Sequence, residues 1–315
     1  MRVIFMGSPE FALPCLDELQ NSPDEVLAVV TQPDRPKGRG QKLTFTPVKE
    51  RALAYGIPVL QPENINHPDF VEQLKALAPD VLVVVAFGQL LKEELLNLPP
   101  LGCINVHASL LPKYRGAAPI HWAIINGEKE TGVTTMFMDR GMDTGDMILK
   151  RTVPIGDHDT TGVLHDKLAE AGRILLRETL DLLRKHQAPR TPQEHSLATY
   201  APLLTREHER IDWTKKAREV HNLVRGMNPW PGAYTTFENK TVKIWETELS
   251  EGKEAAKEGG ESPGAVLEVV NGQGIRVRCG EGSLWLTVLQ PQGKQTMAAE
   301  AWARGARLTK GSTLA

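Results

Sequence analysis

The most constraining feature of this sequence is a nearly continuous run of Val and Leu residues from Asp80 to Ala86. A strand with one face in water alternates apolar and polar residues, whereas a strand without polar residues must be covered on both faces. Parallel strands in a sheet flanked by helices on both sides have this property. The run is also far too short to cross a bilayer. It therefore predicts a central strand of an α/β domain.

Short β-rich runs and helical patterns alternate on both sides of this strand, with Pro and Gly residues between them. The predicted strands are 3–6, 26–31, 57–60, 80–86, 102–107, 132–138 and 146–154, and the predicted helices are 11–19, 47–55, 68–77, 89–96 and 160–185. This order predicts an α/β domain with a mostly parallel sheet. In such a domain the functional site lies at the carboxyl ends of the strands.

The pattern changes after His186. Polar sequence with three prolines extends to Glu209 and is followed by a helical pattern at 214–225. Short strand-like runs come next, at 233–238, 242–247, 265–270, 274–279 and 284–289. Five short strands suit a small closed or half-closed barrel. We therefore predict an α/β catalytic domain at 1–188, a linker at 189–208 and a small C-terminal β-barrel domain at 209–315.

Length, charge and cysteine content narrow the class of protein. A chain of 315 residues usually forms two domains. Its 37 Lys and Arg against 39 Asp and Glu exclude a polycation that coats nucleic acid or membrane, although a local basic patch remains possible. The three cysteines form no CxxC pair and fit a reducing compartment. With no signal peptide or membrane span expected, we predict a cytoplasmic monomer without a metal.

Two polar side chains are expected on one face of the strand at 102–107. Residues two apart in a strand point to the same side, so Asn105 and His107 emerge together. Such a pair by itself is more often a hydrogen-bonded strand end. Here it is followed by the Gly-broken loop 138–146, whose glycines permit turns that bring Asp143 inward. An amide, an imidazole and a carboxylate suit direct transfer through a tetrahedral intermediate, with Asn105 and His107 at the oxyanion and Asp143 in the proton path.

Two long motifs surround these residues. One reads HxSLLPxxRGxxPxxWAI from His107 to Ile124, and the other reads GVTxMxMDxGxDTGD from Gly132 to Asp146. With them the chain resembles the 10-formyltetrahydrofolate-dependent formyltransferases, and the similarity extends from FMGSPEFALPCL at 5–16 to QxxGKxxM at 290–297. The resemblance implies a Rossmann-like N-terminal domain and a C-terminal barrel resembling an OB fold.

The resemblance also implies roles for individual residues. It assigns catalysis to Asn105, His107 and Asp143. Folate contacts are implied for Ala86, Phe87, Gly88, Leu90, Ser109, Leu110, Leu111, Pro112 and Asp139. For Ala86 and Phe87 the alternative role is packing at a strand end. The implied formyl donor is 10-formyltetrahydrofolate, and the implied acceptor is the α-amine of the methionine carried by initiator tRNA.

A basic segment lies between a predicted strand and a predicted helix. It contains four cations, Arg35, Lys37, Arg39 and Lys42. Most such charge runs are solvated loops, and the Gly and Pro content favours mobility. In the resembled family the matching loop enters the acceptor end of the tRNA, where arginines can bind phosphates and stack on unpaired bases.

Two other functions are compatible with parts of the sequence. A formyltransferase acting on a small amine, such as glycinamide ribonucleotide or an amino sugar nucleotide, would use the same three residues but leave the barrel and the basic segment without a role. A non-catalytic RNA-binding protein could reuse the same fold. It would have no need for Asn105, His107 and Asp143 together.

Overall fold

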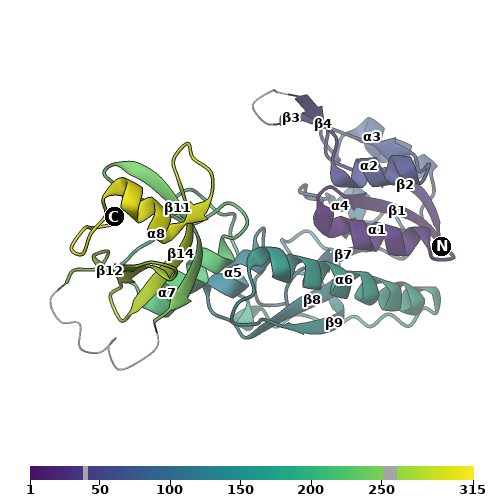
Figure 1. Ribbon diagram of the computed structural model, residues 1–315. Coiled ribbons are helices and arrows are strands. Elements are labelled where there is room, and N and C mark those ends of the chain that lie inside the picture. The colour runs from purple at the N-terminus through teal and green to yellow at the C-terminus, as the bar shows by residue number, and fades with distance from the viewer. Residues whose placement is uncertain (38–41, 251–260) are drawn as a thin grey trace. The chain divides into compact units, whose positions relative to one another are not determined.

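The computed structural model describes residues 1–37, 42–250 and 261–315 (Figure 1). Contacts within the chain divide it into two compact units. Unit 1 comprises Met1–Pro119, Glu130–Pro154 and His165–Ala201, and unit 2 comprises Ile120–Lys129, Ile155–Leu164 and Pro202–Ala315. The division at 1–188, 189–208 and 209–315 remains a prediction. The contacts group residues 189–201 with unit 1 rather than as a separate linker.

Unit 1 is built on a seven-stranded sheet in the order β5-β2-β1-β6-β7-β8-β9. The strands are β1 (Arg2–Gly7), β2 (Glu25–Val30), β5 (Val59–Leu60), β6 (Val81–Val85), β7 (Cys103–His107), β8 (Glu130–Phe137) and β9 (Met147–Pro154). The strands from β5 to β7 pair in parallel, whereas β8 and β9 are antiparallel. Every residue of β6 is buried. The predicted mostly parallel α/β sheet is confirmed.

Helices cover both faces of this sheet. They are α1 (Leu13–Gln20), α2 (Pro47–Ala54), α3 (Pro68–Ala76), α4 (Glu93–Leu96) and α6 (Thr161–Arg184). On one face, Leu82 and Cys103 share a core with Leu74 of α3 and Leu95 of α4. On the other face, Gly172 of α6 lies so close to β7 that an added Cβ would meet Val106 at 3.2 Å. Successive residues of β7 therefore face opposite sides of the sheet: Cys103 faces α3 and α4, and Val106 faces α6.

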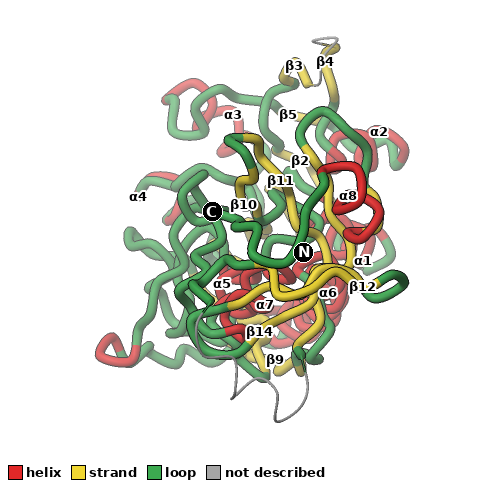
Figure 2. Tube along the Cα trace, turned by 60° about the vertical axis from the view of Figure 1, so that its left-hand side comes forward, coloured by secondary structure: helices red, strands yellow, loops and turns green. Residues whose placement is uncertain are grey.

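The basic segment contains two short strands where the sequence analysis expected only a loop. β3 (Arg35–Lys37) and β4 (Lys42–Thr44) form an antiparallel pair, with Pro36 opposite Leu43. They lie side by side in both views (Figure 1, Figure 2). The expectation of a strandless loop is therefore wrong for these residues. Three-residue strands are too short to produce a recognisable alternation, which explains the error.

Unit 2 contains an antiparallel sheet in the order β10-β11-β14-β13-β12, with β15 beside β14. Its strands are β10 (Tyr234–Phe237), β11 (Lys240–Leu249), β12 (Val266–Val270), β13 (Gly274–Arg278), β14 (Ser283–Pro291) and β15 (Met297–Ala298). Residues 311–315 join its two edges. Ala315 exchanges backbone hydrogen bonds with Thr236 of β10, and Ser312 accepts one from Val266 of β12. The predicted β-domain after the α/β domain is confirmed, and its closure depends on these last residues.

The remaining α-helices of the described chain are α5 (Pro119–Ile125), α7 (Ala217–Gly226) and α8 (Ala299–Ala306), and two 3-10 helices lie at Glu10–Ala12 and His195–Leu197. α5 and α8 were not predicted. The helix expected at 89–96 is present only as α4, because Lys92 is still extended at its N-cap. α7 begins where the Glu219 carboxylate accepts from the backbone N–H of Lys216, a bond typical of helix starts. In unit 2, Trp213, Trp285 and Trp302 are buried, as expected of core residues.

Candidate active site

Strand β7 presents three side chains to the α3/α4 side of the sheet. The alternation that buries Ile104 and Val106 on the opposite face places Cys103, Asn105 and His107 on this one. The Cys103 thiol donates to the carbonyl of Leu95 at 3.4 Å. Burial raises the pKa of this thiol to about 12, so it stays protonated and is a poor nucleophile. The polar pair predicted from the sequence therefore stands beside an inert thiol.

Asp143 comes from the β8–β9 connection, and its own backbone is unusual. Its φ is 55°, a left-handed conformation that Asp tolerates better than most residues. Gly141 and Gly145 were expected to make the irregular turn, but in the structure they allow close contacts instead. A Cβ on Gly141 would meet Thr144 Oγ1 at 2.0 Å, and one on Gly145 would meet the carbonyl oxygen of Phe137 at 1.9 Å. The glycines permit close approach, and the irregular turn is made at Asp143 itself.

The carboxylate of Asp143 lies between the two side chains of β7. Its Oδ1 accepts from Asn105 Nδ2 at 3.3 Å, and its Oδ2 lies 3.7 Å from His107 Nδ1. The backbone N–H of Gly116 donates to Oδ2 at 2.8 Å. Residues separated by 38 positions in the chain are thus brought into one cluster. The structure gathers the three side chains that the sequence analysis selected.

The other ring nitrogen of His107 identifies its tautomer. Nε2 lies 3.0 Å from the carbonyl oxygen of Tyr114. A carbonyl can only accept, so Nε2 carries a hydrogen whether the ring is neutral or charged. Nδ1 is therefore the ring nitrogen that faces the Asp143 carboxylate. Tyr114, which supplies this carbonyl, also has a positive φ, of 59°.

The predicted folate-binding residues lie in three chain segments: 86–90, 109–112 and the β8–β9 connection, which contains Asp139. Ser109, Leu110, Leu111 and Pro112 follow β7 after Ala108, and Ser109 and Leu111 are 0% exposed. The Ser109 hydroxyl donates to the carbonyl of Lys113 at 2.6 Å. Phe87 is only 2% exposed and belongs to the core, which favours its alternative packing role. The backbone around it remains accessible, because Ala86 and Gly88 are exposed and Leu90 is 67% exposed.

Asp139 lines a hollow of about 280 Å³ in unit 1. Its carboxylate accepts from Thr144 Oγ1 at 2.6 Å and from the Gly141 N–H at 3.0 Å. Other lining residues that the sequence analysis missed are Glu93, Leu96, Asn97, Phe137, Arg140 and Arg190. The hollow reaches Cys103, which precedes Asn105 by two residues on the same strand face. Two residues of a strand span about 7 Å, so the Cys103 edge of the hollow lies about that far along β7 from Asn105.

The predicted tRNA-binding cations lie at or near the β3–β4 pair. Arg35 begins β3 and is exposed, Lys37 ends β3 and Lys42 begins β4. Arg39 lies outside the described residues. Next to β3, Asp34 pairs with Lys49 and accepts from Gln61 Nε2 at 2.9 Å, and these bonds lower the pKa of its carboxyl.

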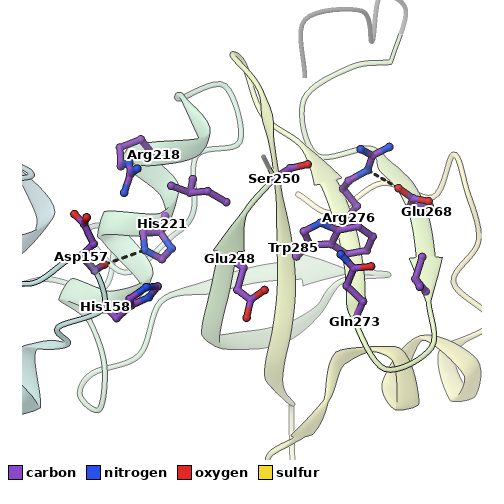
Figure 3. Close-up of a pocket in the computed structure, with 12 residues that line it drawn as sticks. Asp157, His158, Arg218, His221, Glu248, Ser250, Glu268, Gln273, Arg276 and Trp285 are labelled. Carbon is purple, nitrogen blue, oxygen red and sulfur yellow. Dashed lines mark hydrogen bonds and ion pairs between the residues drawn. The ribbon is translucent and has the colours of Figure 1, made fainter. Parts of the chain in front are cut away.

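Unit 2 has a hollow of its own, of about 700 Å³ (Figure 3). Cations and carboxylates line it together, and Arg276 pairs with Glu268 at 2.7 Å. His221 lies on its α7 side, with Nδ1 at 2.9 Å from Thr247 Oγ1. Burial lowers the pKa of His221, which favours the neutral ring. The mixed charge of this hollow identifies no particular ligand.

Among the described residues, no group of three or more His, Cys, Asp or Glu side chains is placed to hold a metal ion. None of the helices in the same part of the chain combines the length and the apolar character that crossing a membrane requires.

Comparison with known proteins connects this geometry to a family. Residues 1–180 match the formyl transferase family, and residues 203–307 match the formyl transferase C-terminal domain. The chain belongs to the formyl transferase family. Both matches agree with the order of an α/β unit followed by a β-domain, and the first includes all three residues of the Asn105–His107–Asp143 cluster.

Full-length relatives of this formyl transferase are similar along the whole chain. The methionyl-tRNA formyltransferase of Desulforamulus reducens is 54% identical over 314 residues, covering 100% of this chain and 98% of the relative. That of Caldanaerobacter subterraneus subsp. tengcongensis is 50% identical over 315 residues and covers 100% of both chains. A solved structure of HypX from Aquifex aeolicus in complex with tetrahydrofolic acid shares the fold, with a TM-score of 0.64 and 19% identity over 96% of this chain. The match spans about half of HypX, 47% of its chain.

Proposed function

We propose that this formyl transferase moves a formyl group from 10-formyltetrahydrofolate to the α-amino group of methionyl initiator tRNA. The observation that carries the proposal is the full-length similarity, at 50–54% identity, to proteins named methionyl-tRNA formyltransferase. Because the similarity includes unit 2 as well as unit 1, it favours this acceptor over a small amine. The same substrate implies a cytoplasmic enzyme, and we propose that it acts as a monomer.

The residues of the site suit each part of this reaction. The folate supplies the formyl group, and the amine of the methionine attacks its carbon. Asn105 uses one N–H on Asp143 Oδ1, and an amide has a second N–H that can bind the developing oxyanion. His107 supports the same oxyanion through Nδ1 when that nitrogen carries a proton. Asp143 accepts the proton that leaves the attacking amine, and the folate nitrogen takes up a proton as the carbon–nitrogen bond breaks.

The hollow beside Asp139 is the proposed place for one ring system of the folate. A volume of about 280 Å³ is slightly below that of whole small-molecule sites, which suits a ring rather than an entire folate. Its polar lining offers carboxylate and amide groups to a heterocycle with several N–H groups. Ser109, Leu110, Leu111 and Pro112 follow the strand on which Asn105 and His107 lie. Ser109 and Leu111 are fully buried, so we propose the partly exposed Leu110 and Pro112 as contacts for the remainder of the molecule.

We propose that the β3–β4 pair contacts the acceptor end of the tRNA. Besides the exposed Arg35, it presents Leu43, 69% exposed, and the adjacent Phe45 is also exposed. Cations that bind phosphates and aromatic side chains on which unpaired bases stack are the usual combination for single-stranded RNA, and Phe45 supplies an aromatic ring here. For the tRNA body we propose unit 2, because residues 206–315 carry 16 Lys and Arg against 14 Asp and Glu in an otherwise slightly acidic chain.

The proposal is tested by one assay with two kinds of acceptor. The full-length protein is incubated with 10-formyltetrahydrofolate and either charged initiator tRNA or the small amines glycinamide ribonucleotide and an amino sugar nucleotide. We expect formylation of the methionyl-tRNA alone. Formylation of the small amines without the tRNA would establish the alternative acceptor, and binding of tRNA without any transfer would indicate a non-catalytic RNA-binding protein.

A further inference from the structure

Residues 191–201 connect the two loops that complete the site. At one end, Thr191 exchanges backbone hydrogen bonds with Met147, just after the Asp143 loop. At the other, Thr199 and Ala201 bond to the backbone of Arg115 and Ala118, just after the Tyr114 turn. All these residues belong to unit 1. We call residues 191–201 the strap, because they cross from one loop to the other.

Gln193 is the strap residue that holds the backbone beside Asp143. Its side-chain Nε2 donates to the carbonyl oxygens of Asp143 and Gly145, both at 2.8 Å. Gln193 is only 6% exposed. A buried amide that donates to two carbonyls on either side of one turn fixes the direction of that turn. This matters here because Asp143 has a φ of 55°, a conformation that a non-glycine residue keeps only where its surroundings enforce it.

Arg115 in turn holds Gln193. It donates to Gln193 Oε1 from Nε at 3.1 Å and from Nη2 at 2.6 Å. A guanidinium fork of this kind binds one acceptor in a defined direction. Arg115 is 2% exposed and also donates to His195 Nδ1 at 3.3 Å. Because the fork occupies Oε1, the amide of Gln193 cannot flip and presents its N–H groups to the Asp143 loop.

The strap also acts on the histidine side of the site. The hydroxyl of Thr199 accepts from the backbone N–H of Tyr114 at 2.9 Å, and the Tyr114 carbonyl is the group that accepts from His107 Nε2. One segment therefore positions both the carboxylate and the ring that faces it. Between these two attachments, the Gly116 N–H reaches Asp143 Oδ2 at 2.8 Å, so the distance between the two loops decides whether this bond forms.

We propose that the strap is a positioning device for the transfer reaction, in which Gln193, held by Arg115, sets the place of the Asp143 carboxylate between Asn105 and His107. Gln193 touches neither reacting atoms nor the catalytic side chains, and it acts through the backbone of Asp143. Its effect on turnover rests on the proposed function, whereas its effect on the geometry of the loop does not.

The decisive variant is Gln193→Glu in the full-length protein. A carboxylate of the same length keeps the acceptor for Arg115, now as an ion pair, but replaces the two N–H donors by an oxygen that repels the carbonyls of Asp143 and Gly145. The contact with Arg115 is therefore preserved, while the hydrogen bonds to the carbonyls of Asp143 and Gly145 are lost. Gln193→Met, which has a similar shape and no hydrogen-bonding amide, is the second variant in case the first does not fold.

Two readouts separate positioning from a general structural role. We expect kcat to fall by about 10- to 100-fold, as small misplacements of reacting groups do, with KM for the folate and for the tRNA changed less than about threefold. Independently of activity, hydrogen exchange of the Gly116 amide should accelerate by about tenfold or more, because its acceptor on Asp143 has moved. The amide of Val83 in β6 should exchange as in the wild type, since the core is intact.

The matched control is Glu194→Gln, the opposite substitution at the neighbouring position. The Glu194 side chain is exposed and accepts from Ser196 on the same segment, so kcat and Gly116 exchange should match the wild type. Wild-type kcat in a folded Gln193 variant, or unchanged exchange at Gly116, would overturn the proposal. An inactive wild type would refute the proposed function instead, and the exchange data would still decide whether the strap holds Asp143.

Discussion

At the residue scale, the reactivity of the site depends on one residue with an unfavourable backbone conformation. Asp143 is left-handed, yet three hydrogen bonds converge on it: from Asn105 and Gly116 to its carboxylate, and from Gln193 to its carbonyl. Such bonds offset the conformational cost and leave the carboxylate with a single direction. A general acid or base has to be placed in this way before its proton affinity matters.

Replacing Asp143 by Asn tests its part in the proton path. Asn adopts left-handed conformations as readily as Asp, so the variant should fold and keep the hydrogen bond from Gly116. An amide oxygen is a poor proton acceptor, and we expect kcat to fall by about 10²- to 10⁴-fold, the usual contribution of general acid–base catalysis. The pH–rate profile should lose one limb. An unchanged profile in the folded variant would remove Asp143 from the proton path.

At the element scale, the β8–β9 connection is shaped by backbone contacts that leave no room for side chains. A Cβ on Gly145 would lie 1.9 Å from the carbonyl oxygen of Phe137, at the last residue of β8. The Phe137 N–H in turn donates to the carbonyl of Asp146 at 2.9 Å. The connection is thus a tight reversal, and the placement of Asp143 depends on it.

Gly145→Ala should therefore destabilise unit 1 and lower activity together. We expect a loss of about 1–3 kcal/mol in the free energy of unfolding, as for overpacking elsewhere, and a fall in kcat because the Asp143 loop must shift. Denaturant unfolding and steady-state kinetics measure the two effects. Gly305→Ala in α8 is the control, since its Cβ meets no atom within 4 Å and the substitution should be neutral or slightly stabilising. Equal behaviour of the two variants would contradict the steric argument.

The β3–β4 pair belongs to the same scale. Arg35→Ala should weaken use of the tRNA and reduce the salt dependence of its binding, because one phosphate contact fewer releases fewer counterions. Binding of the folate should change little, since the folate residues lie elsewhere in unit 1. Titrations with tRNA and with folate at several salt concentrations measure both. A variant that loses folate affinity and keeps its tRNA curve would place Arg35 in the folate pocket.

At the scale of the whole molecule, the two units can be followed separately. All six tryptophans lie in unit 2, so tryptophan fluorescence reports its unfolding. In unit 1, the Asp24 side chain is buried and its carboxylate pairs with Arg184 and with the N-terminal ammonium. Burial opposes ionisation of this carboxyl, but the two cations outweigh it and lower its pKa. Stability from Asp24 is therefore present above its ordinary pKa of 3.8 and is lost only in stronger acid.

Unit 2 should begin to lose stability at a higher pH than the acidic range in which the contribution of Asp24 is lost. Burial lowers the pKa of His221 below its ordinary 6.5, so the unfolded chain takes up a proton that the folded unit resists. The stability is complete above pH 6.5 and declines as the pH falls through the lowered pKa. His221→Gln, which can still bond to Thr247, should flatten this decline. Urea unfolding followed by tryptophan fluorescence at pH 7.5, 6 and 5 measures the free energy of unfolding of unit 2. If this free energy falls with pH equally in the wild type and in His221→Gln, His221 is excluded as the cause.

Local patterns in the sequence determined much of this fold. The apolar run at β6, the alternation of strands and helices, and the shared face of Asn105 and His107 follow from side-chain periodicity, which acts over a few residues. The same periodicity does not detect β3, β4 or the four-residue α4, because elements of three or four residues contain too few repeats. It also gave no sign of α5 and α8.

Only the tertiary structure decided which distant residues meet. Nothing in a local pattern shows that Gln193 holds the Asp143 loop 50 residues away, or that residues 311–315 join β10 to β12. Residues 189–201 were predicted as part of a linker because polar, Pro-containing sequence is typical of linkers, yet they form backbone bonds across the site. Such contacts depend on how the packed elements bring chain segments together. That information lies in the whole sequence at once and in no single stretch of it.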